Sequence, residues 1–344
     1  MRVLVTGGTG FVGSHTVAAL LSAGHEIRLL VRKPERIRAA LEPLGISEPI
    51  DYAVGDVTDP ESVKRAVQGC QAVLHAAAVY NLDSRAAKVT KDTNAPGTRV
   101  VLEAAVAHGC DPVVYVSTTL ALLRRGVTAT PDSPLSTVRG GYIASKADAE
   151  RVARNLQDEG APVTIVHPGG VVGTNDPHLS GEMRRLRDVL KGRYPFFPSG
   201  GYHIVDVRSV ARTHAAVMTP GGAPRRYIVP GHRLDGRTLF GTLRAVTGRR
   251  LPYLTQPAAV MLPVTWAASA AQRILPFRVP AEYEAALVLY NNTACDDSRA
   301  REELGIHPPP LVETFRDAVR WLYQAGHISS RQAGDAGCRR SLRR

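Results

Sequence analysis

A tyrosine and a lysine stand four positions apart at Tyr142 and Lys146, in the segment Tyr-Ile-Ala-Ser-Lys. On a helix this spacing places both side chains on one face, so they point at the same volume. A phenol with its ordinary pKa of about 10 is a poor acid–base catalyst near neutral pH. A neighbouring ammonium favours the phenolate and lowers that pKa. The pair therefore predicts general acid–base chemistry.

Hydroxyl side chains end an expected strand in the segment Ser117-Thr118-Thr119. A hydroxyl at this place can hold a carbonyl oxygen that is being reduced. Successive side chains of a strand point to opposite faces, so only one of the two threonines can face Tyr142. From the spacing alone, both Thr118 and Thr119 are candidates.

A glycine-rich loop, TGGTGFVG at residues 6–13, follows the first expected strand and begins the first expected helix. Glycines there permit a tight turn, a close approach of backbone to a pyrophosphate and close packing of helix on strand. The amides of Phe11 and Val12 would point at the pyrophosphate from the helix N-terminus. The loop predicts dinucleotide binding. Its glycines are Gly7, Gly8, Gly10 and Gly13.

The residues after the second expected strand bear on the choice between NAD(H) and NADP(H). A carboxylate there accepts both ribose hydroxyls of NAD but repels a 2′-phosphate, whereas an arginine attracts the phosphate. Arg32 and Lys33 stand at this place, and Arg36 follows. We predict that NADP(H) is favoured over NAD(H). For Lys33 and Arg36 individually, a basic surface cluster is the alternative.

Two further strand ends predict contacts with the dinucleotide. Asp56 is placed to accept from the adenine amino group, with the amide of Val57 beside it. An Asx turn before the next helix is the alternative role for Asp56. After His75, the small side chains of Ala76 and Ala77 let the backbone lie along the cofactor. We assign His75 no catalytic role.

These residues lie in a chain whose first half alternates short β-branched runs with amphipathic stretches. Such alternation predicts an α/β fold with a doubly wound parallel sheet of the Rossmann type and a smaller C-terminal substrate lobe. The expected strands are 2–6, 26–31, 50–54, 72–75, 113–117 and 163–167. The expected helices are 13–23, 34–41, 61–68, 93–108 and 142–159.

The alternation ends near Pro168, where glycine and proline become dense. We therefore predict a nucleotide-binding domain over 1–168, to which the chain returns around 203–218, and a mainly substrate-binding lobe over 169–327. Residues 328–344 carry five arginines against one aspartate and show no apolar periodicity. We expect these last residues to form a basic, disordered tail.

Composition excludes several classes of protein. With 344 residues, 44% of them hydrophobic and 22% charged, the chain can build a packed core and is no disordered polymer or disulfide-stapled miniature. The net charge of +12 lies partly in the expected tail, and we predict no nucleic-acid partner. Four scattered cysteines without a CxxC pair predict neither a metal site nor a disulfide framework. The start lacks a signal-sequence pattern and no apolar run could span a bilayer, so we expect a cytoplasmic protein.

Together these motifs resemble extended short-chain dehydrogenase/reductases, the NAD-dependent epimerase/dehydratase family. Within it, the branch of dihydroflavonol 4-reductases and 3β-hydroxysteroid dehydrogenases is the most similar. The motifs are TGGTGFVG at 6–13, VRKP at 31–34, GDVTD at 55–59, HAAA at 75–78, TNAPGT at 93–98, YVSTT at 115–119, YIASK at 142–146, HPGGVVG at 167–173 and VDVRSVA at 205–211.

The resemblance implies roles for particular residues. Tyr142 would be the general acid, Lys146 would bind the nicotinamide ribose, and Thr119 would supply the hydroxyl. Relatives usually have serine there, and threonine keeps the hydroxyl but restricts χ1 through its added methyl. The resemblance also implies that Asn94 is a structural or proton-relay residue and that Pro168 to Val171 lie against the carboxamide.

The leading functional hypothesis is an NADP(H)-dependent oxidoreductase that interconverts a ketone and a secondary alcohol on a hydrophobic small molecule. A nucleotide-sugar epimerase of the same family would normally show an acid near Val31. A sugar dehydratase would need acids after the strand-end hydroxyl, where Leu-Ala-Leu stands at 120–122. A non-catalytic NADP-sensing protein would typically lack Tyr142 or Lys146.

The substrate end is less specific. Aromatic residues could line an apolar pocket, with lobe core as the alternative. The apolar segment 258–274 is expected to pack as an ordinary helix rather than to contact a membrane surface. A homodimer through a helix pair is expected from the resemblance alone. The pocket candidates are Tyr80, Phe196, Phe197, Tyr202 and the region 257–271.

Overall fold

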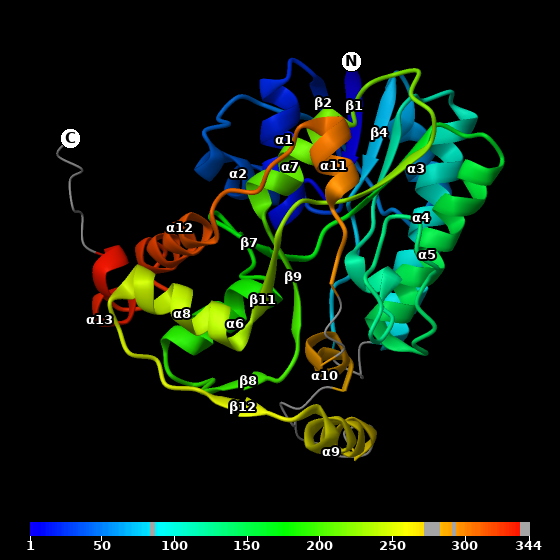
Figure 1. Ribbon diagram of the computed structural model, residues 1–344. Helices are drawn as coiled ribbons and strands as arrows, with labels where there is room; N and C mark the ends of the chain where they lie inside the picture. The colour runs from blue at the N-terminus through cyan, green and yellow to red at the C-terminus, as the bar shows by residue number, and fades with distance from the viewer. Residues whose placement is uncertain (83–86, 272–282, 291–293, 338–344) are drawn as a thin grey trace.

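The protein is described from a computed structural model, which covers residues 1–82, 87–271, 283–290 and 294–337. A seven-stranded sheet forms its centre, with all strands parallel in the order β10-β6-β5-β4-β1-β2-β3 (Figure 1). The doubly wound Rossmann fold is thereby confirmed. The order reverses between β1 and β4, where such sheets bind their ligands. The strands are β1 (Arg2–Thr6), β2 (Glu26–Val31), β3 (Asp51–Val54), β4 (Ala72–His75), β5 (Val113–Val116), β6 (Val163–His167) and β10 (Arg225–Ile228).

Helices cover both faces because alternate strand residues point to opposite sides. Val3 and Val5 of β1 pack in one cluster with α1, α7 and α11, whereas Leu4 packs in another with α3, α4 and α5. The helix ends agree with the sequence predictions within two residues, except that α4 begins six residues earlier. The helices are α1 (Phe11–Ser22), α2 (Arg36–Leu41), α3 (Pro60–Val67), α4 (Ala87–Ala107), α5 (Gly141–Asp158), α7 (Val207–Ala216) and α11 (Ser298–Leu304).

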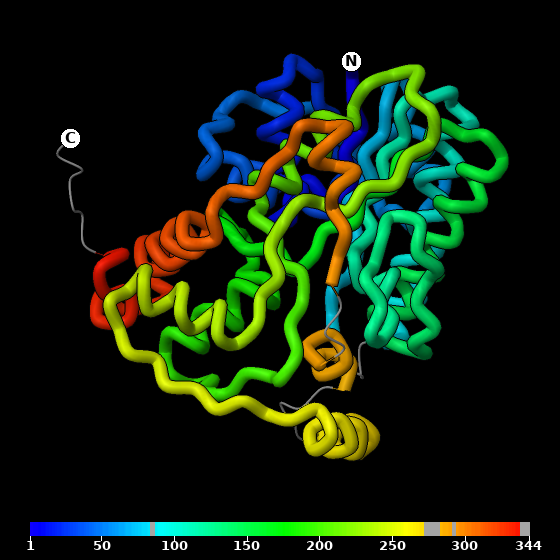
Figure 2. The backbone as a smooth tube through the Cα atoms, in the orientation of Figure 1, coloured from blue at the N-terminus to red at the C-terminus, as the bar shows by residue number. Residues whose placement is uncertain are grey.

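A smaller lobe lies beyond the carboxyl ends of the strands (Figure 2). A three-stranded sheet in the order β11-β9-β7 packs there against helices through Leu243, Phe315 and Leu322. A two-stranded sheet of β8 and β12 leads on to α9 and α10. The elements are β7 (Gly170–Val172), α6 (Gly181–Leu190), β8 (Phe196–Pro198), β9 (Gly201–Asp206), β11 (His232–Asp235), α8 (Gly236–Thr247), β12 (Leu254–Gln256), α9 (Ala258–Ala271), α10 (Tyr283–Tyr290) and α12 (Leu311–Gln324).

The chain returns to the central sheet in more places than the expected 203–218. Besides α7, strand β10 pairs with β6, and α11 packs Ala300 into the core beside the sheet. Two arginines open β10, so its sequence does not show the apolar run of a buried strand. The two parts of the molecule are therefore joined through several crossings.

The prediction of a disordered tail from residue 328 is wrong for residues 328–337. Ser329 caps a short helix, α13 (Ser330–Ala333), which a 3₁₀-helix, η4 (Gly334–Gly337), follows. Ile328, Ala333 and Ala336 are buried in the lobe core. Small residues fill this narrow space without an apolar periodicity that the sequence could reveal. The rest of the expected tail, residues 338–344, lies outside the described residues.

The 258–274 segment is expected to pack as an ordinary helix, and its described part, α9, packs on α10 but leaves apolar side chains exposed. The buried residues of α9 are Thr265 and Ser269, whereas Val260, Val264 and Trp266 are 58%, 52% and 61% exposed. The helix turns its polar side inward because Ser269 Oγ accepts a hydrogen bond from the Tyr283 amide of α10, at 2.8 Å. Among the described helices, none is long and apolar enough to cross a bilayer.

Candidate active site

The glycine loop between β1 and α1 is built from closely packed backbone. Gly7 has a φ of +75°, and a Cβ there would lie 2.7 Å from the amide nitrogen of Ala77. A Cβ on Gly13 would lie 2.0 Å from the carbonyl oxygen of Gly7. Both positions therefore require glycine, since an L side chain would displace backbone. Gly10 is the N-cap of α1, and its amide donates to the Gly7 carbonyl at 2.9 Å.

The first turn of α1 begins at Phe11 and Val12, whose amides have no acceptor within the helix. Amides at a helix N-terminus bind anions, and the absence of side chains on the loop lets a phosphate approach closely. On these two observations, the loop fits the pyrophosphate of a dinucleotide.

Opposite charges meet where β2 and β3 end. The Arg32 guanidinium lies 3.8 Å from the Asp56 carboxylate, and its side chain is 73% exposed. Asp56 accepts from the amide and the hydroxyl of Thr58, at 2.9 and 2.8 Å. Burial opposes ionisation of Asp56, but these hydrogen bonds and Arg32 lower its pKa. The Asx turn considered for Asp56 is present, and Lys33 and Arg36 lie exposed beside it.

The tyrosine and the lysine occupy the first turns of α5, and both are buried. Lys146 Nζ donates to the Val116 carbonyl at 2.9 Å and lies 4.6 Å from the centre of the Tyr115 ring. Burial lowers the pKa of Lys146 to about 7, against the opposing charge of Glu150. Burial raises the pKa of Tyr142, and Tyr80 and Glu284 raise it further, opposite to the lowering expected from Lys146.

A carboxylate from a distant part of the chain caps α5. Glu284 of α10 accepts from the amides of Tyr142 and Ile143, at 3.0 and 2.5 Å. Gly141 has a φ of +69°, and a Cβ there would collide with the Glu284 carboxylate. This contact joins residues more than 140 positions apart, so no local sequence signal predicts it. Glu284 is one of the groups that raise the pKa of Tyr142.

The three hydroxyl residues after β5 have different partners. Ser117 donates to Glu150 at 2.6 Å. Thr118 accepts from the Leu120 amide at 3.3 Å and so caps the 3₁₀-helix η3 (Thr119–Leu122). The Thr119 amide donates to the Pro168 carbonyl at 2.9 Å, but its hydroxyl bonds to none of the described residues. Of the three, Thr119 is thus the residue whose hydroxyl has no partner among the described residues.

Asn94 of α4 is fully engaged with the protein. Its amide group accepts from the Val79 amide at 2.8 Å and donates to the Val79 carbonyl at 3.1 Å. It also donates to Ser145 Oγ at 2.9 Å, and Ser145 donates to the Tyr142 carbonyl at 2.7 Å. Asn94 therefore ties the loop after β4 to the first turn of α5.

The aromatic residues expected at the substrate end divide into two groups. Tyr80 lies edge-to-face on Tyr142, with ring centres 4.9 Å apart. Phe197 and Tyr202 are buried in the lobe core, where the Tyr202 hydroxyl donates to Glu182 at 2.7 Å. The structure thus brings Tyr80 to the site and uses Phe197 and Tyr202 for packing.

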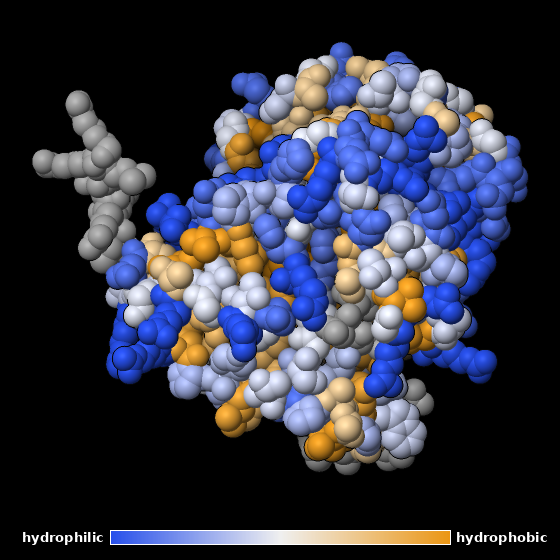
Figure 3. All heavy atoms as spheres, in the orientation of Figure 1, coloured by the Kyte–Doolittle hydropathy of each residue, from blue (hydrophilic) through white to orange (hydrophobic). Residues whose placement is uncertain are grey.

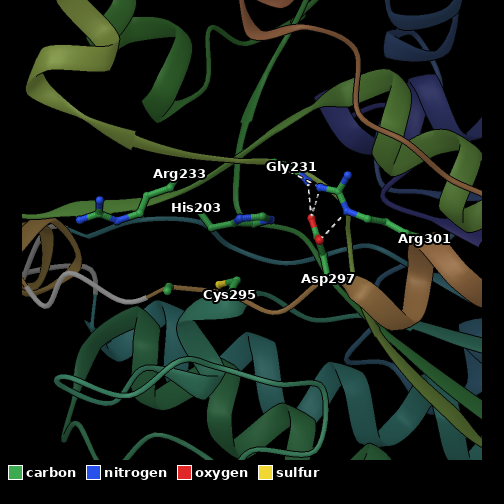
Figure 4. A pocket seen from close by; sticks show the side chains of 7 residues that line it. His203, Gly231, Arg233, Cys295, Asp297 and Arg301 are labelled. Atoms are coloured by element: carbon green, nitrogen blue, oxygen red, sulfur yellow. Dashed lines mark hydrogen bonds and ion pairs between the residues drawn. The ribbon is translucent and has the colours of Figure 1, made fainter.

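A cavity of about 180 Å³ lies between the lobe and the segment before α11 (Figure 4). His203 of β9 faces it, with Cys295 on the opposite side. Asp297 accepts from the Gly231 amide at 2.8 Å and pairs with Arg301 at 2.7 Å. These contacts join α11 to the turn before β11, so they stabilise the connection between the two parts. No described group of His, Cys, Asp or Glu residues could hold a metal ion.

Comparison with known proteins agrees with this geometry. Residues 3–229 match the profile of the NAD dependent epimerase/dehydratase family, which covers the glycine loop, α5 and β10. The chain belongs to the NAD-dependent epimerase/dehydratase family. The resemblance drawn from the motifs is therefore confirmed, and the protein is an NAD(P)-dependent enzyme of the oxidoreductase type.

Relatives of this family member span nearly its whole length. A putative dihydroflavonol 4-reductase of Synechocystis sp. is 30% identical over 95% of this chain and 96% of its own. Sterol demethylase protein B of Methylococcus capsulatus is 30% identical over 95% of this chain and all of its own. A dTDP-glucose 4,6-dehydratase of Streptomyces venezuelae, solved with NAD bound, is 26% identical with a TM-score of 0.73, covering 94% of this chain and 97% of its own.

Proposed function

We propose that this epimerase/dehydratase-family enzyme interconverts a ketone and a secondary alcohol on a hydrophobic small molecule, with NADP(H) as the cofactor. The observation that carries the proposal is the unengaged Thr119 hydroxyl at the end of β5, in a fold that also sets Tyr142 and Lys146 on neighbouring α5. Two relatives are named as a putative dihydroflavonol 4-reductase and a sterol demethylase protein, and these names favour an apolar substrate.

The cofactor supplies or accepts a hydride when it is bound. The loop with Gly7, Gly10 and Gly13 holds the pyrophosphate through its amides, and Lys146 holds the nicotinamide ribose. Tyr142 donates its phenolic proton to the carbonyl oxygen during reduction and takes a proton from the alcohol in the reverse direction. Its raised pKa keeps the phenol protonated, which is the form that an acid needs.

Thr119 donates a hydrogen bond to the same oxygen and so stabilises the negative charge that develops there. The neighbouring hydroxyl oxygen of Thr118 accepts from the Leu120 amide, which ties that side chain to η3. Pro168 and Val171 would lie against the carboxamide of the cofactor, as the resemblance implies.

The preference for NADP(H) rests on the exposed Arg32 at the end of β2. Its guanidinium can form a charge-assisted bond with a 2′-phosphate, and Lys33 adds positive charge beside it. Asp56, with Val57 next to it, receives the adenine from the end of β3. The Asp56 carboxylate lies 3.8 Å from the exposed Arg32 guanidinium, too far for a short hydrogen bond, so Arg32 can turn toward a phosphate.

The residues after Thr119 favour a reductase over a sugar dehydratase. Ala121 and Leu122 are buried in η3, where a dehydratase would need exposed acids.

An assay with a panel of apolar ketones tests the proposal. With at least one ketone the absorbance of NADPH should fall, and the absorbance of NADH should fall more slowly with the same ketone. Interconversion of a nucleotide sugar without net consumption of NADPH would contradict it and favour an epimerase.

A further inference from the structure

An apolar surface extends over the end of the lobe, formed by β8, β12 and α9. Leu254 of β12 is 66% exposed and pairs in register with Phe196 of β8, which is also exposed. Figure 3 shows apolar side chains at the lower edge of the molecule, where Figure 1 places β8, β12 and α9. We name this surface the α9 face; its exposed apolar residues are Tyr194, Phe196, Leu254, Val260, Val264 and Trp266.

The orientation of α9 is the reverse of an ordinary surface helix. A helix that is apolar on all sides is normally buried, and a soluble monomer rarely exposes several large apolar side chains together. Here the inward residues are polar and satisfied: Thr265 donates to the Met261 carbonyl at 2.8 Å, and Ser269 accepts from Tyr283. The contact with α10 thus leaves several large apolar side chains of α9 exposed in the part of the chain that the structure describes.

The charged side chains nearest to β8, β12 and α9 in the sequence are mostly basic. Residues 236–271, which include β12 and α9, contain four arginines and no aspartate or glutamate. Residues 189–200, which include β8, contain Lys191 and Arg193 and also no acid. Arg193 and Arg250 are exposed just before the two strands. The face is therefore apolar with a positive border, which is complementary to an apolar surface that carries negative charge.

A second copy of the chain is a less favourable occupant of this face than an anionic surface. A two-fold contact would bring two borders of the same positive charge into one interface. Anionic lipid headgroups attract such a border of basic side chains. A 14-residue helix is about 21 Å long, shorter than the hydrocarbon core of about 30 Å, so α9 would lie within the interface rather than cross it.

We propose that the α9 face docks on the surface of an anionic lipid bilayer, with Val260, Val264 and Trp266 entering the boundary between headgroups and acyl chains. The proposal rests on this surface alone and does not require the proposed reaction. If both hold, the enzyme takes its apolar substrate directly from the bilayer.

Vesicle binding by the full-length protein tests the proposal. The chain has two tryptophans, so Trp321→Phe leaves Trp266 as the only indole reporter. With vesicles of phosphatidylcholine and phosphatidylglycerol, the Trp266 emission should shift to shorter wavelength and the protein should co-sediment. With phosphatidylcholine alone, binding should be at least fivefold weaker, and salt should weaken binding to the mixed vesicles.

Matched variants distinguish vesicle binding through the α9 face from nonspecific adsorption of the protein. Val264→Asp should reduce co-sedimentation at least tenfold, and Arg193→Glu about fivefold or more. Tyr52→Asp, at a 49% exposed residue of β3, should bind like the unmodified protein. Each variant is used only if it binds NADPH and unfolds at the original temperature. Failure to bind mixed vesicles, equal loss in Tyr52→Asp, or a concentration-dependent dimer that Val264→Asp abolishes without any vesicle binding would overturn the proposal.

Discussion

The three consecutive hydroxyl residues after β5 show how the fold selects one group for chemistry. Ser117 bonds to buried Glu150, whose pKa falls to about 2 through the neighbouring His167 and its hydrogen bonds although burial opposes this. Thr118 caps η3, and Thr119 keeps a hydroxyl that the described protein groups do not use. The resemblance and the hydrogen-bond pattern thus lead to the same residue.

Substitutions at these threonines distinguish the two candidates. Thr119→Val keeps the shape but removes the hydrogen bond to the developing oxyanion, so single-turnover rates with saturating NADPH should fall by about 10²–10³. Thr119→Ser should stay active because serine restores the donor. Thr118→Val should mainly lower the unfolding temperature through loss of the cap on η3. A large rate loss in Thr118→Val with little effect in Thr119→Val would show that the register is wrong.

Glu284 adds a negative charge next to the phenol of Tyr142. Because that charge opposes formation of the phenolate, Glu284→Gln should lower the pKa of Tyr142. The rate of alcohol oxidation, which needs the phenolate, should therefore rise at lower pH in Glu284→Gln, while Glu284→Asp should leave the pH–rate profile nearer its original position. A profile that does not move in Glu284→Gln would mean that the carboxylate only caps α5.

Arg32 is expected to decide between the two nicotinamide cofactors. A charge-assisted bond to a 2′-phosphate contributes about 1.5–3 kcal/mol, so titrations should show tighter binding of NADPH than of NADH. Arg32→Asp should narrow or reverse this difference by weakening NADPH, with NADH as the internal control. Equal affinities in the unmodified protein would contradict the assignment.

At the scale of elements, local patterns predicted the sheet well. Apolar β-branched runs defined six of the seven parallel strands to within one residue at each end. The i to i+4 spacing of Tyr142 and Lys146 on α5 and the glycine loop before α1 were also readable, because their geometry depends on neighbours in the chain. Strand β10 was not predicted, because it begins with two arginines and lies in a segment rich in glycine and proline.

Long-range contacts explain what the sequence could not predict. Glu284 reaches the N-terminus of α5 from α10, and only tertiary structure places it there. The inward polar side of α9 is set by Tyr283 of α10, so composition alone suggested a buried helix. The structure establishes where the site residues lie and which groups they bond to. Their roles in catalysis are predictions.

The short helix α13 provides a test at the scale of elements. Ala333 is fully buried in the lobe core between α8 and α12, and a Cβ on the next residue, Gly334, would lie 2.0 Å from the Thr247 carbonyl. Ala333→Asp buries a charge there and should lower the free energy of unfolding by about 3 kcal/mol. Arg331→Ala, at an exposed residue of the same helix, should change it by less than about 0.5 kcal/mol. Similar effects in urea denaturation of both variants would contradict the observed packing.

At the scale of the whole molecule, the cofactor end and the α9 face are separate. Figure 1 shows α2, which follows Arg32 and Lys33, well away from α9 at the lower edge. A protein docked through α9 would therefore leave the cofactor site open to solution. The several crossings between sheet and lobe hold the site residues of β5, α5 and α10 in one arrangement.

In the proposed reaction, Tyr142 and Thr119 support hydride transfer between NADP(H) and an apolar carbonyl compound. The most direct measurement uses NADPH deuterated at the transferable position, an apolar ketone that the enzyme consumes, and mass spectrometry of the alcohol. One deuterium should appear on the carbinol carbon for each NADPH oxidised, and Tyr142→Phe should bind NADPH but form labelled alcohol about 10²–10⁴ times more slowly. Unlabelled alcohol, or labelling at the original rate in Tyr142→Phe, would contradict the account.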